Sequence, residues 1–250
     1  MLEPIKVWLR GDYNSIRYKY YRLPKEWLEY ILLYRLCGKS WVDFYAARLD
    51  RAALINPDTQ PPESYTLQGL LHLEYMKSQG LEPSQSLLDY GCGVCRSGVN
   101  FAKYLNSGNY VGADISRERL KRGKAIMERE GLASDSYQLT YLNNCHLSEF
   151  QGMTFDYVFA KSVLTHMPEK DIRTMLLAMR SVLKETGKFY FTYSKADNRK
   201  RRNIKDFWYT KSEMRTFCEE AGYEYTVMED WQGHSDVMAR VSMIKSKTER

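Results

Sequence analysis

The chain has 250 residues, of which 44% are apolar and 27% are charged. This composition is typical of a globular protein with one large domain, or with one domain and an extension. No run approaches the roughly 18 consecutive apolar residues of a membrane-spanning helix, so a spanning protein is excluded. The first residues include a proline and charges where a signal peptide has an apolar stretch, and we therefore expect a cytoplasmic protein.

The five cysteines are an odd number spread over the whole chain, which is unlike the paired framework of a small secreted protein. Reduced thiols are expected. Cys92 and Cys95 form one C-x-x-C pair, but no second pair and no nearby pair of histidines completes a zinc site. The sequence therefore predicts no metal.

Three helices are predicted before the first strand. Pro24 begins the first, Gly38 ends it, and Ser40 caps the second. Eleven of the 34 aromatic residues lie in the first 50 positions, so residues 1–62 are expected to form an aromatic-rich extension. It either covers a ligand cleft as a lid or packs on the sheet or on another subunit. The helices are expected over residues 25–37, 41–55 and 66–79, the third with a buried face of Leu67, Leu70, Leu71 and Met76.

From residue 86 the pattern changes to short apolar runs that alternate with helical segments, which is typical of βαβ units around a parallel sheet. Gly131 and Gly187 stand where helices are expected to end. We predict strands over residues 87–90, 110–115, 138–142, 155–160 and 188–193, separated by helices over 99–105, 117–130 and 170–184. A helix over 211–222 and two antiparallel strands over 223–228 and 237–244 are expected to follow.

The loop after the first strand, in LLDYGCGVCRSG, is the strongest candidate for a binding site. Gly91 and Gly93 let the backbone approach a ligand, and ligands of open α/β sheets bind at the carboxyl ends of the strands. Asp114 ends the second strand, at the spacing of an acid that accepts hydrogen bonds from ribose hydroxyls. A nicotinamide dinucleotide site needs a third glycine where this chain has Arg96. Asp89 would also repel a pyrophosphate but suits an ammonium or sulfonium group.

At these residues the chain resembles the class I S-adenosylmethionine-dependent methyltransferases, from about residue 86 to the C-terminus. LLDYGCG is similar to the first motif of the family, and FDYVFAKSVLTHMP is similar to its fourth-strand motif. The resemblance implies a Rossmann-like, seven-stranded, mostly parallel sheet with an antiparallel final strand in residues 63–250. It also implies S-adenosylmethionine as the cofactor, held by Asp89, Tyr90, Gly91, Cys92, Gly93, Asp114, Ile115, Asn143, Asn144 and Lys161.

The chain departs from the family at two of these places. Cys95 stands where the first motif often has a third glycine, which would crowd the loop slightly. Asn143 and Asn144 stand where the family often has an acid for the adenine amino group, and an amide oxygen can accept the same hydrogen bond. The ammonium of Lys161 would contact either an acidic substrate or solvent.

Methyl transfer requires mainly that donor and acceptor are aligned. An acceptor hydroxyl must also lose its proton, and His166 in SVLTHM is the candidate base, although it could instead only pack at the start of a helix. Residues 195–205, here called the basic segment, carry six bases and one acid of a chain with formal net charge +6. The segment either binds an anionic acceptor or forms a charged exposed loop.

Three functions stay open on the sequence. The first is a methyltransferase that acts on a small molecule or a sugar-containing acceptor, because SVLTHMP resembles the form of the motif in bacterial enzymes of that kind. The second is a nucleic-acid methyltransferase, which only the basic segment and the high pI of 8.9 support. The third is a non-catalytic scaffold that binds the cofactor. A homodimer is also open.

Overall fold

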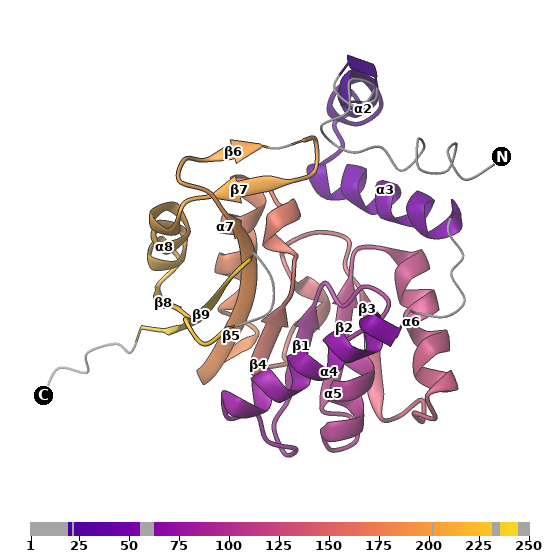
Figure 1. Ribbon diagram of the computed structural model, residues 1–250, viewed down its shortest axis with the longest axis vertical. Coiled ribbons are helices and arrows are strands. Elements are labelled where there is room, and N and C mark those ends of the chain that lie inside the picture. Colours follow the sequence, from indigo (N-terminus) through magenta and orange to yellow (C-terminus); the bar gives the residue numbers. More distant parts are fainter. Residues whose placement is uncertain (1–19, 22, 56–62, 202, 232–235, 245–250) are drawn as a thin grey trace, which may run out of the picture.

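The computed structural model describes residues 20–21, 23–55, 63–201, 203–231 and 236–244. Its strands include β1 Leu87–Tyr90, β2 Tyr110–Asp114, β3 Tyr137–Tyr141, β4 Phe155–Ala160, β5 Leu183–Lys195, β8 Tyr223–Val227 and β9 Val237–Met243. Five parallel strands lie in the order β3-β2-β1-β4-β5 (Figure 1). The final strand, β9, pairs with β5 in the antiparallel direction, and β8 pairs antiparallel with β9. The predicted Rossmann-like sheet with a reversed final strand is confirmed.

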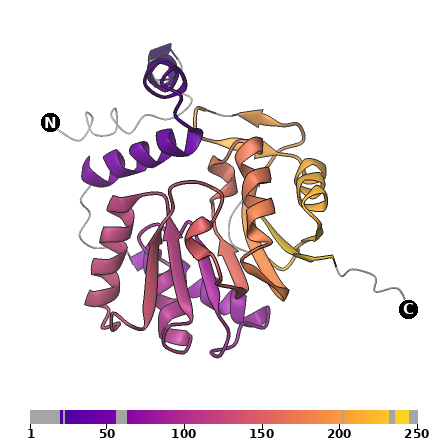
Figure 2. The same cartoon turned by 180° about the vertical axis from the view of Figure 1, so that it is seen from behind.

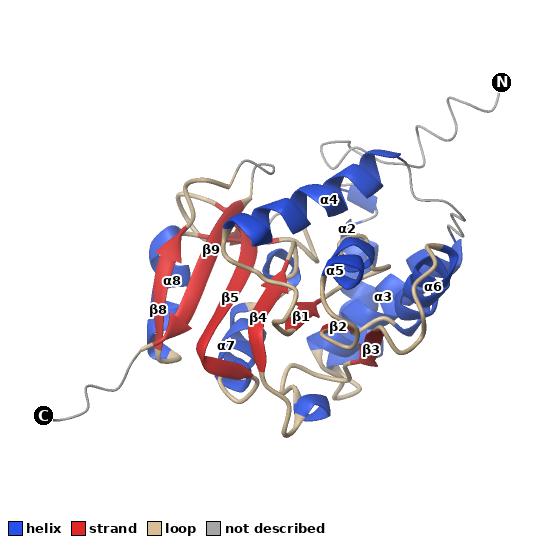
Figure 3. Ribbon diagram, turned by 90° about the horizontal axis from the view of Figure 1, so that it is seen from below, coloured by secondary structure: helices blue, strands red, loops and turns tan. Residues whose placement is uncertain are grey.

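Helices cover both faces of the sheet (Figure 3). On one face lie α4 (Glu63–Ser78), α5 (Gly98–Tyr104) and α6 (Arg117–Arg129), and on the other lie α7 (Glu169–Met179) and α8 (Lys211–Glu220). The view from behind shows α7 over its face of the sheet (Figure 2). Because side chains alternate along a strand, β5 sends Phe189 and Phe191 into the core under α7 and α8, and Tyr190 into the other core.

The described residues of the basic segment are not a simple loop. β6 (Lys200–Arg201) and β7 (Phe207–Tyr209) form an antiparallel hairpin, and β7 pairs in parallel with the end of β5, where Ser194 is opposite Trp208. These strands were not predicted, because two or three residues are too short to show an alternating pattern. Arg202 lies outside the described residues.

The predicted helix over residues 170–184 is too long. α7 ends at Met179, and β5 begins at Leu183, before Gly187. The Phe155 N–H donates to the carbonyl of Val182 at 2.8 Å, and Leu183 pairs with Phe155. Pairing with β4 therefore holds the chain in an extended conformation from Leu183 on, where the sequence pattern predicts a helix.

The buried face predicted for α4 is also wrong in part. Leu67, Leu70 and Leu71 are exposed, while Gly69 and Met76 are buried. A Cβ at Gly69 would lie 2.2 Å from the carbonyl oxygen of Arg96. The close contact between this helix and the loop after β1 thus selects the face with the glycine.

The helical lead lies across the carboxyl ends of the strands (Figure 1). It consists of α2 (Leu23–Tyr30), the π-helical η2 (Ile31–Arg35) and α3 (Trp41–Ile55). The Trp41 indole N–H donates to the carbonyl of His166 at 2.9 Å, and the Ser116 hydroxyl donates to Asp50 at 2.6 Å. α3 is therefore attached both to the loop after β4 and to the start of α6. The division of the chain at residue 62 stays a prediction.

Candidate functional site

A cavity of about 690 Å³ lies beneath α3 at the carboxyl ends of the parallel strands, and we call it the main cavity. This rim is where open α/β sheets bind ligands. Its walls come from the loops after β1, β2 and β4 and from α3, α4 and α6. Nine of the eleven residues singled out in the sequence line it, namely Asp89, Tyr90, Gly91, Cys92, Gly93, Asp114, Ile115, Lys161 and His166.

The other two residues, Asn143 and Asn144, are not among those that line the main cavity. Leu142 and Cys145 reach it from the same loop. The Asn144 side-chain oxygen accepts a hydrogen bond from the His146 N–H at 2.8 Å. The contact of the two amides with an adenine group stays a prediction.

The glycine loop after β1 is bound to the end of β2. The N–H groups of Gly91 and Cys92 both donate to the Ala113 carbonyl, at 2.7 and 3.0 Å. Gly91 has φ +79°, and a Cβ there would lie 2.3 Å from Cγ2 of Val163. Only glycine fits both the conformation and the space. Any larger residue would push the loop after β4 away and change the shape of the main cavity.

Cys95 does not crowd the main cavity. It takes a left-handed conformation with φ +60°, and its side chain is fully buried in the core under α4, α5 and α6. Gly123 on α6 leaves room for it, because a Cβ there would lie 2.6 Å from the Cys95 sulfur. The expected crowding of the loop is therefore avoided by a glycine on the neighbouring helix.

Asp89 places a buried carboxyl group at the bottom of the main cavity. Only 4% of it is exposed, and the Tyr110 hydroxyl donates to Oδ2 at 3.1 Å. Burial raises the pKa of Asp89 to about 7, although the bond from Tyr110 opposes the shift. Asp114 adds a second negative charge nearby. A cation bound in the main cavity would therefore relieve an unfavourable electrostatic environment.

Asp114 is oriented by backbone donors on both oxygens. Oδ2 accepts from the Gly93 N–H and Oδ1 accepts from the Ser116 N–H, each at 2.8 Å. Burial raises the pKa of Asp114, while Arg119 and the two backbone donors oppose the shift. A carboxylate has about four acceptor positions, so these two bonds leave it able to accept hydroxyl donors as well.

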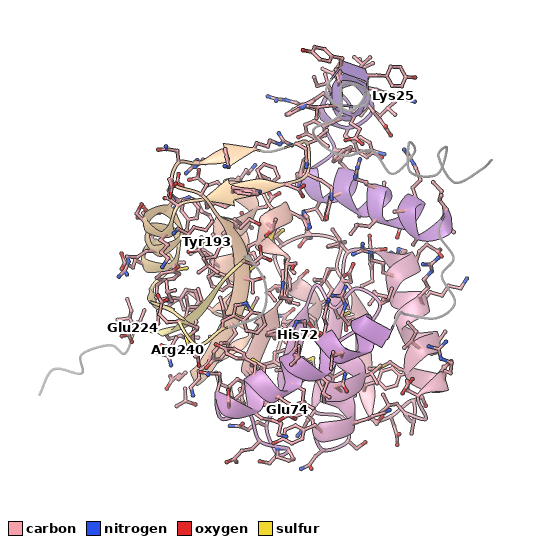
Figure 4. The ribbon with its side chains drawn as sticks, viewed as in Figure 1. Lys25, His72, Glu74, Tyr193, Glu224 and Arg240 are labelled. Atoms are coloured by element: carbon pink, nitrogen blue, oxygen red, sulfur yellow. The ribbon has the colours of Figure 1, made fainter. Side chains whose placement is uncertain are left out.

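His72 of α4 also belongs to the site, although no sequence pattern singled it out. It is 4% exposed and lines the main cavity (Figure 4). Its Nδ1 lies 2.6 Å from the Ser97 hydroxyl, and its ring stacks on Trp231 at a centroid distance of 5.9 Å. Beside it, Arg96 donates to the side-chain oxygen of Gln68 at 2.6 Å. No local sequence signal marks this contact, because it depends on which face of α4 is buried.

Lys161 lines the main cavity and forms an ion pair within the protein. Its ammonium lies 3.3 Å from Oδ2 of Asp236 and 2.7 Å from the Ser162 hydroxyl. Burial lowers the pKa of Lys161, and Asp236 opposes that shift. The ion pair joins the loop after β4 to the start of β9, so the lysine holds one wall of the main cavity in place.

His166 is held by the carboxylate of Asp206, which no sequence pattern singled out. Its Nδ1 lies 3.0 Å from Oδ1 of Asp206 and 3.1 Å from the Lys205 carbonyl. Burial would raise the pKa of Asp206, but hydrogen bonds from His166 and Asn203 lower it to about 2. With Nδ1 engaged as a donor, Nε2 is left as the basic nitrogen. This arrangement suits a base that is oriented by an acid.

Two arginines of the basic segment are engaged within the protein. Arg199 forms ion pairs with Glu169 and Glu213. The guanidinium of Arg201 lies against the rings of Trp27, Trp41 and Phe207, at 4.3 to 4.9 Å from their centroids, and donates to the Ile204 carbonyl. Their contacts stabilise the hairpin and the helical lead, which leaves them poorly placed to bind a substrate.

Comparison with known proteins identifies a family. A family model described as a methyltransferase domain matches residues 81–239. A probable methyltransferase of Aspergillus luteorubrus is 30% identical over 134 residues, which cover 52% of this chain and 45% of that protein. The sterol 24-C-methyltransferase of Yarrowia lipolytica is 26% identical over 63% of this chain and 36% of its own length. The chain thus spans less than half the length of these curated relatives.

Solved structures show the same fold. The magnesium protoporphyrin IX methyltransferase of Synechocystis PCC 6803, solved with bound SAM, aligns with a TM-score of 0.62 at 13% identity, over 83% of this chain and 99% of that one. A DhpI–SAH complex aligns with a TM-score of 0.56 at 14% identity, over 81% and 95% of the two chains. At these identities the likeness concerns the fold.

The raised pKa of Asp89 predicts a pH-dependent effect of Asp89→Asn on the free energy of unfolding. The native carboxyl ionises near pH 7 and the unfolded one near 3.8. The ionised carboxylate therefore destabilises the native state fully above pH 7 and does not destabilise it below pH 3.8. We expect the variant to gain stability over the wild type as the pH rises from about 4 to 8, by up to about 4 kcal/mol in urea unfolding.

Asp156→Asn is the matched control, because Asp156 accepts hydrogen bonds from Ser86 and Lys184 at the opposite rim of the sheet. These bonds outweigh burial and lower its pKa. This variant should lose stability relative to the wild type as the pH rises from about 3 to 5. A pH-independent gain for Asp89→Asn would contradict the raised pKa.

Proposed function

The chain belongs to the S-adenosylmethionine-dependent methyltransferase family, and from this premise we propose that it methylates a small organic molecule or sugar derivative that carries a negative charge. The charge of the main cavity is the observation that carries the proposal. Six basic side chains and three acids line it. They are Arg48, Arg96, Arg119, Arg122, Lys161 and Lys205 against Asp89, Asp114 and Asp171.

The residues present fit the cofactor. The backbone of the glycine loop lines the main cavity at Gly91 and Gly93, and Asp89 offers a buried carboxyl group that gains from a nearby ammonium or sulfonium. We propose that Asp114 accepts the ribose hydroxyls. We further propose that Arg96 and His72 face the amino-acid end of the cofactor, since they form the wall next to Asp89 and the loop. When bound, S-adenosylmethionine supplies a methyl group activated by the positive charge on its sulfur.

The chain itself supplies alignment and exclusion of water. α3 covers the main cavity, and its attachments to His166 and Ser116 fix it relative to both ends of the site. Arg48 and Arg122 line the main cavity from α3 and α6, where Arg48 pairs with Glu26 and Arg122 donates to the Ala53 carbonyl. Because a guanidinium has five N–H donors, each could also form charge-assisted hydrogen bonds with a carboxylate or phosphate of the acceptor. Holding donor and acceptor in one geometry is the main requirement of a direct displacement.

We propose His166 as the general base for an acceptor hydroxyl. Asp206 fixes the ring through Nδ1, and Nε2 is the atom that would take the proton. The negative charge of Asp206 would also stabilise the imidazolium that forms. Asp206 acts through His166 and is therefore a positioning residue.

A nucleic-acid substrate is not favoured, because Arg199 and Arg201 are engaged with acids and aromatic rings of the same chain. A non-catalytic scaffold would bind the cofactor without turnover. Calorimetric titration with S-adenosylmethionine and an assay with the labelled methyl group separate the enzyme from the scaffold. Binding without transfer to any acceptor supports the scaffold. The absence of binding would show that this chain does not use S-adenosylmethionine.

Asp114→Ala tests the cofactor site. We expect the dissociation constant for S-adenosylmethionine to rise at least about tenfold by calorimetry, since a buried charged acceptor is lost. Asp156→Ala is the control, because that acid also accepts a backbone N–H but lies at the far rim. Equal affinities of the Asp114→Ala variant and the wild type would exclude the ribose contact.

The charge of the acceptor is tested with a panel of small carboxylates, sugar phosphates and their neutral esters. We expect kcat/KM to be at least about tenfold higher for a charged acceptor than for its ester, because only the charged form pairs with the basic wall. A preference for the esters would overturn the anionic acceptor while leaving the methyltransferase activity in place.

His166→Ala is expected to lower kcat by about 100-fold or more, because a positioned base contributes a factor of this order. Cofactor affinity should stay within about twofold of the wild type. Asp206→Asn should lower kcat by less and change its pH profile, which a purely structural contact would not do. His146→Ala, on an exposed loop, is the control. A full rate for His166→Ala would mean that the acceptor needs no base.

A further inference from the structure

The outward side of α2 and η2 is apolar and has no partner among the described residues. We call it the outer face and define it by Leu28, Ile31, Leu32, Leu33 and Leu36. These side chains are 39 to 71% exposed. Of the fourteen large apolar side chains that are exposed in the described part of the chain, seven lie within residues 20–36, including Tyr20 and Tyr21. Such a concentration marks an interaction surface, whereas single exposed leucines do not.

The opposite side of the same helices explains why the outer face is not part of the core. Trp27, Tyr30 and Tyr34 pack around Trp41 and Phe44 of α3, with the rings of Tyr30 and Phe44 5.0 Å apart. The helix therefore already has one partly buried apolar side. A surface helix normally has polar residues on the other side, and here that side carries leucines at positions 28, 32 and 36.

Charge is also divided between the two sides. The acids of α2 point inward, where Glu26 pairs with Arg48 and Glu29 pairs with Arg51 of α3. The charged residues that are exposed along positions 23–40 are all basic, namely Lys25, Arg35 and Lys39. Figure 4 shows Lys25 at the outer end of the molecule, far from His72 in the main cavity. The outer face thus combines aliphatic side chains with an unopposed positive charge.

We propose that the outer face docks on the surface of a bilayer that contains anionic lipids. Leucines and an isoleucine would enter the acyl boundary, and Lys25, Arg35 and Lys39 would meet the phosphates, as in interfacial amphipathic helices. Tyr20 and Tyr21 are of a type that favours the boundary between lipid and water. No helix of the described residues is long and apolar enough to cross a bilayer, so the contact is a surface one.

A second copy of this chain fits the outer face less well. Two such faces packed against each other would bring Lys25, Arg35 and Lys39 of both copies together, and like charges at an interface oppose association. An anionic surface removes this repulsion. The proposal does not depend on the proposed methyl transfer, because the side chains that would contact lipid do not line the main cavity.

The test is co-sedimentation of the full-length protein with vesicles of pure phosphatidylcholine, or of phosphatidylcholine with about 30% phosphatidylglycerol. We expect binding to the anionic vesicles at least about tenfold tighter than to the neutral ones, and weaker at about 0.5 M salt because the charges are screened. No binding to anionic vesicles, or equal binding to both kinds, would overturn the proposal.

The double substitution Leu28→Glu with Leu32→Glu should lower the affinity for anionic vesicles at least about tenfold. Leu177→Glu is the matched control, because Leu177 is equally exposed but lies on α7, and it should bind like the wild type. Circular dichroism and cofactor titration verify that both variants fold. If the wild type is instead a dimer in sedimentation velocity, and Leu28→Glu with Leu32→Glu makes it monomeric, the outer face binds a second copy and the proposal is wrong.

Discussion

The hydrogen bonds between the glycine loop and the end of β2 are the constraint from which the site is built. Gly91 and Cys92 donate to the Ala113 carbonyl, and Gly93 donates to Asp114. The other oxygen of Asp114 accepts from Ser116, whose hydroxyl caps α6 and donates to Asp50 of α3. One carboxylate therefore connects the loop, the start of a helix and the cover of the main cavity. Because each partner fixes the next, the shape of the rim is set before any ligand binds, and little ordering remains to oppose binding.

This arrangement has an electrostatic cost in the free protein. Asp89 and Asp114 are both buried, and burial raises the pKa of each. The cost is smaller when a positively charged ligand occupies the space between them, since opposite charges attract more strongly in a dry cavity than in water. The basic side chains that line the main cavity attract an anion in the same way. The main cavity thus offers buried carboxyl groups that suit the proposed sulfonium donor and basic side chains that suit the proposed anionic acceptor.

The parts of this site that can be predicted from the sequence are those formed by residues close together in the chain or by the ends of predicted strands. Asp89, Gly91 and Gly93 lie at the end of one strand and in the loop after it, and the strand pattern alone brings Asp114 to the same edge, so this part of the main cavity was predictable. His72 was not, because its burial depends on which side of α4 faces the sheet, and the exposed Leu67, Leu70 and Leu71 gave the opposite indication. Asp206 was missed for a related reason: it is 40 positions from His166, in a hairpin whose strands are too short to show a period. Composition likewise cannot reveal that Arg199 and Arg201 of the basic segment have partners within the fold, while Lys205 of the same segment lines the main cavity.

The helical lead joins the two proposals in one element. The acids and aromatic rings of α2 and η2 face α3 and hold it over the main cavity, and the leucines and bases of α2 and η2 face outward. A cover selected only for solubility would have charged residues on its outer side and leucines on its inner side. Exposed leucines lower solubility, and acids on the inner side must be paired. The observed order is favourable if the outer side meets an anionic apolar surface. In that case the cover of the site would lie at the boundary between lipid and water, where an acceptor with an apolar body and a charged group concentrates. The charge of the main cavity and the character of the outer face would then select the same kind of molecule by two independent means.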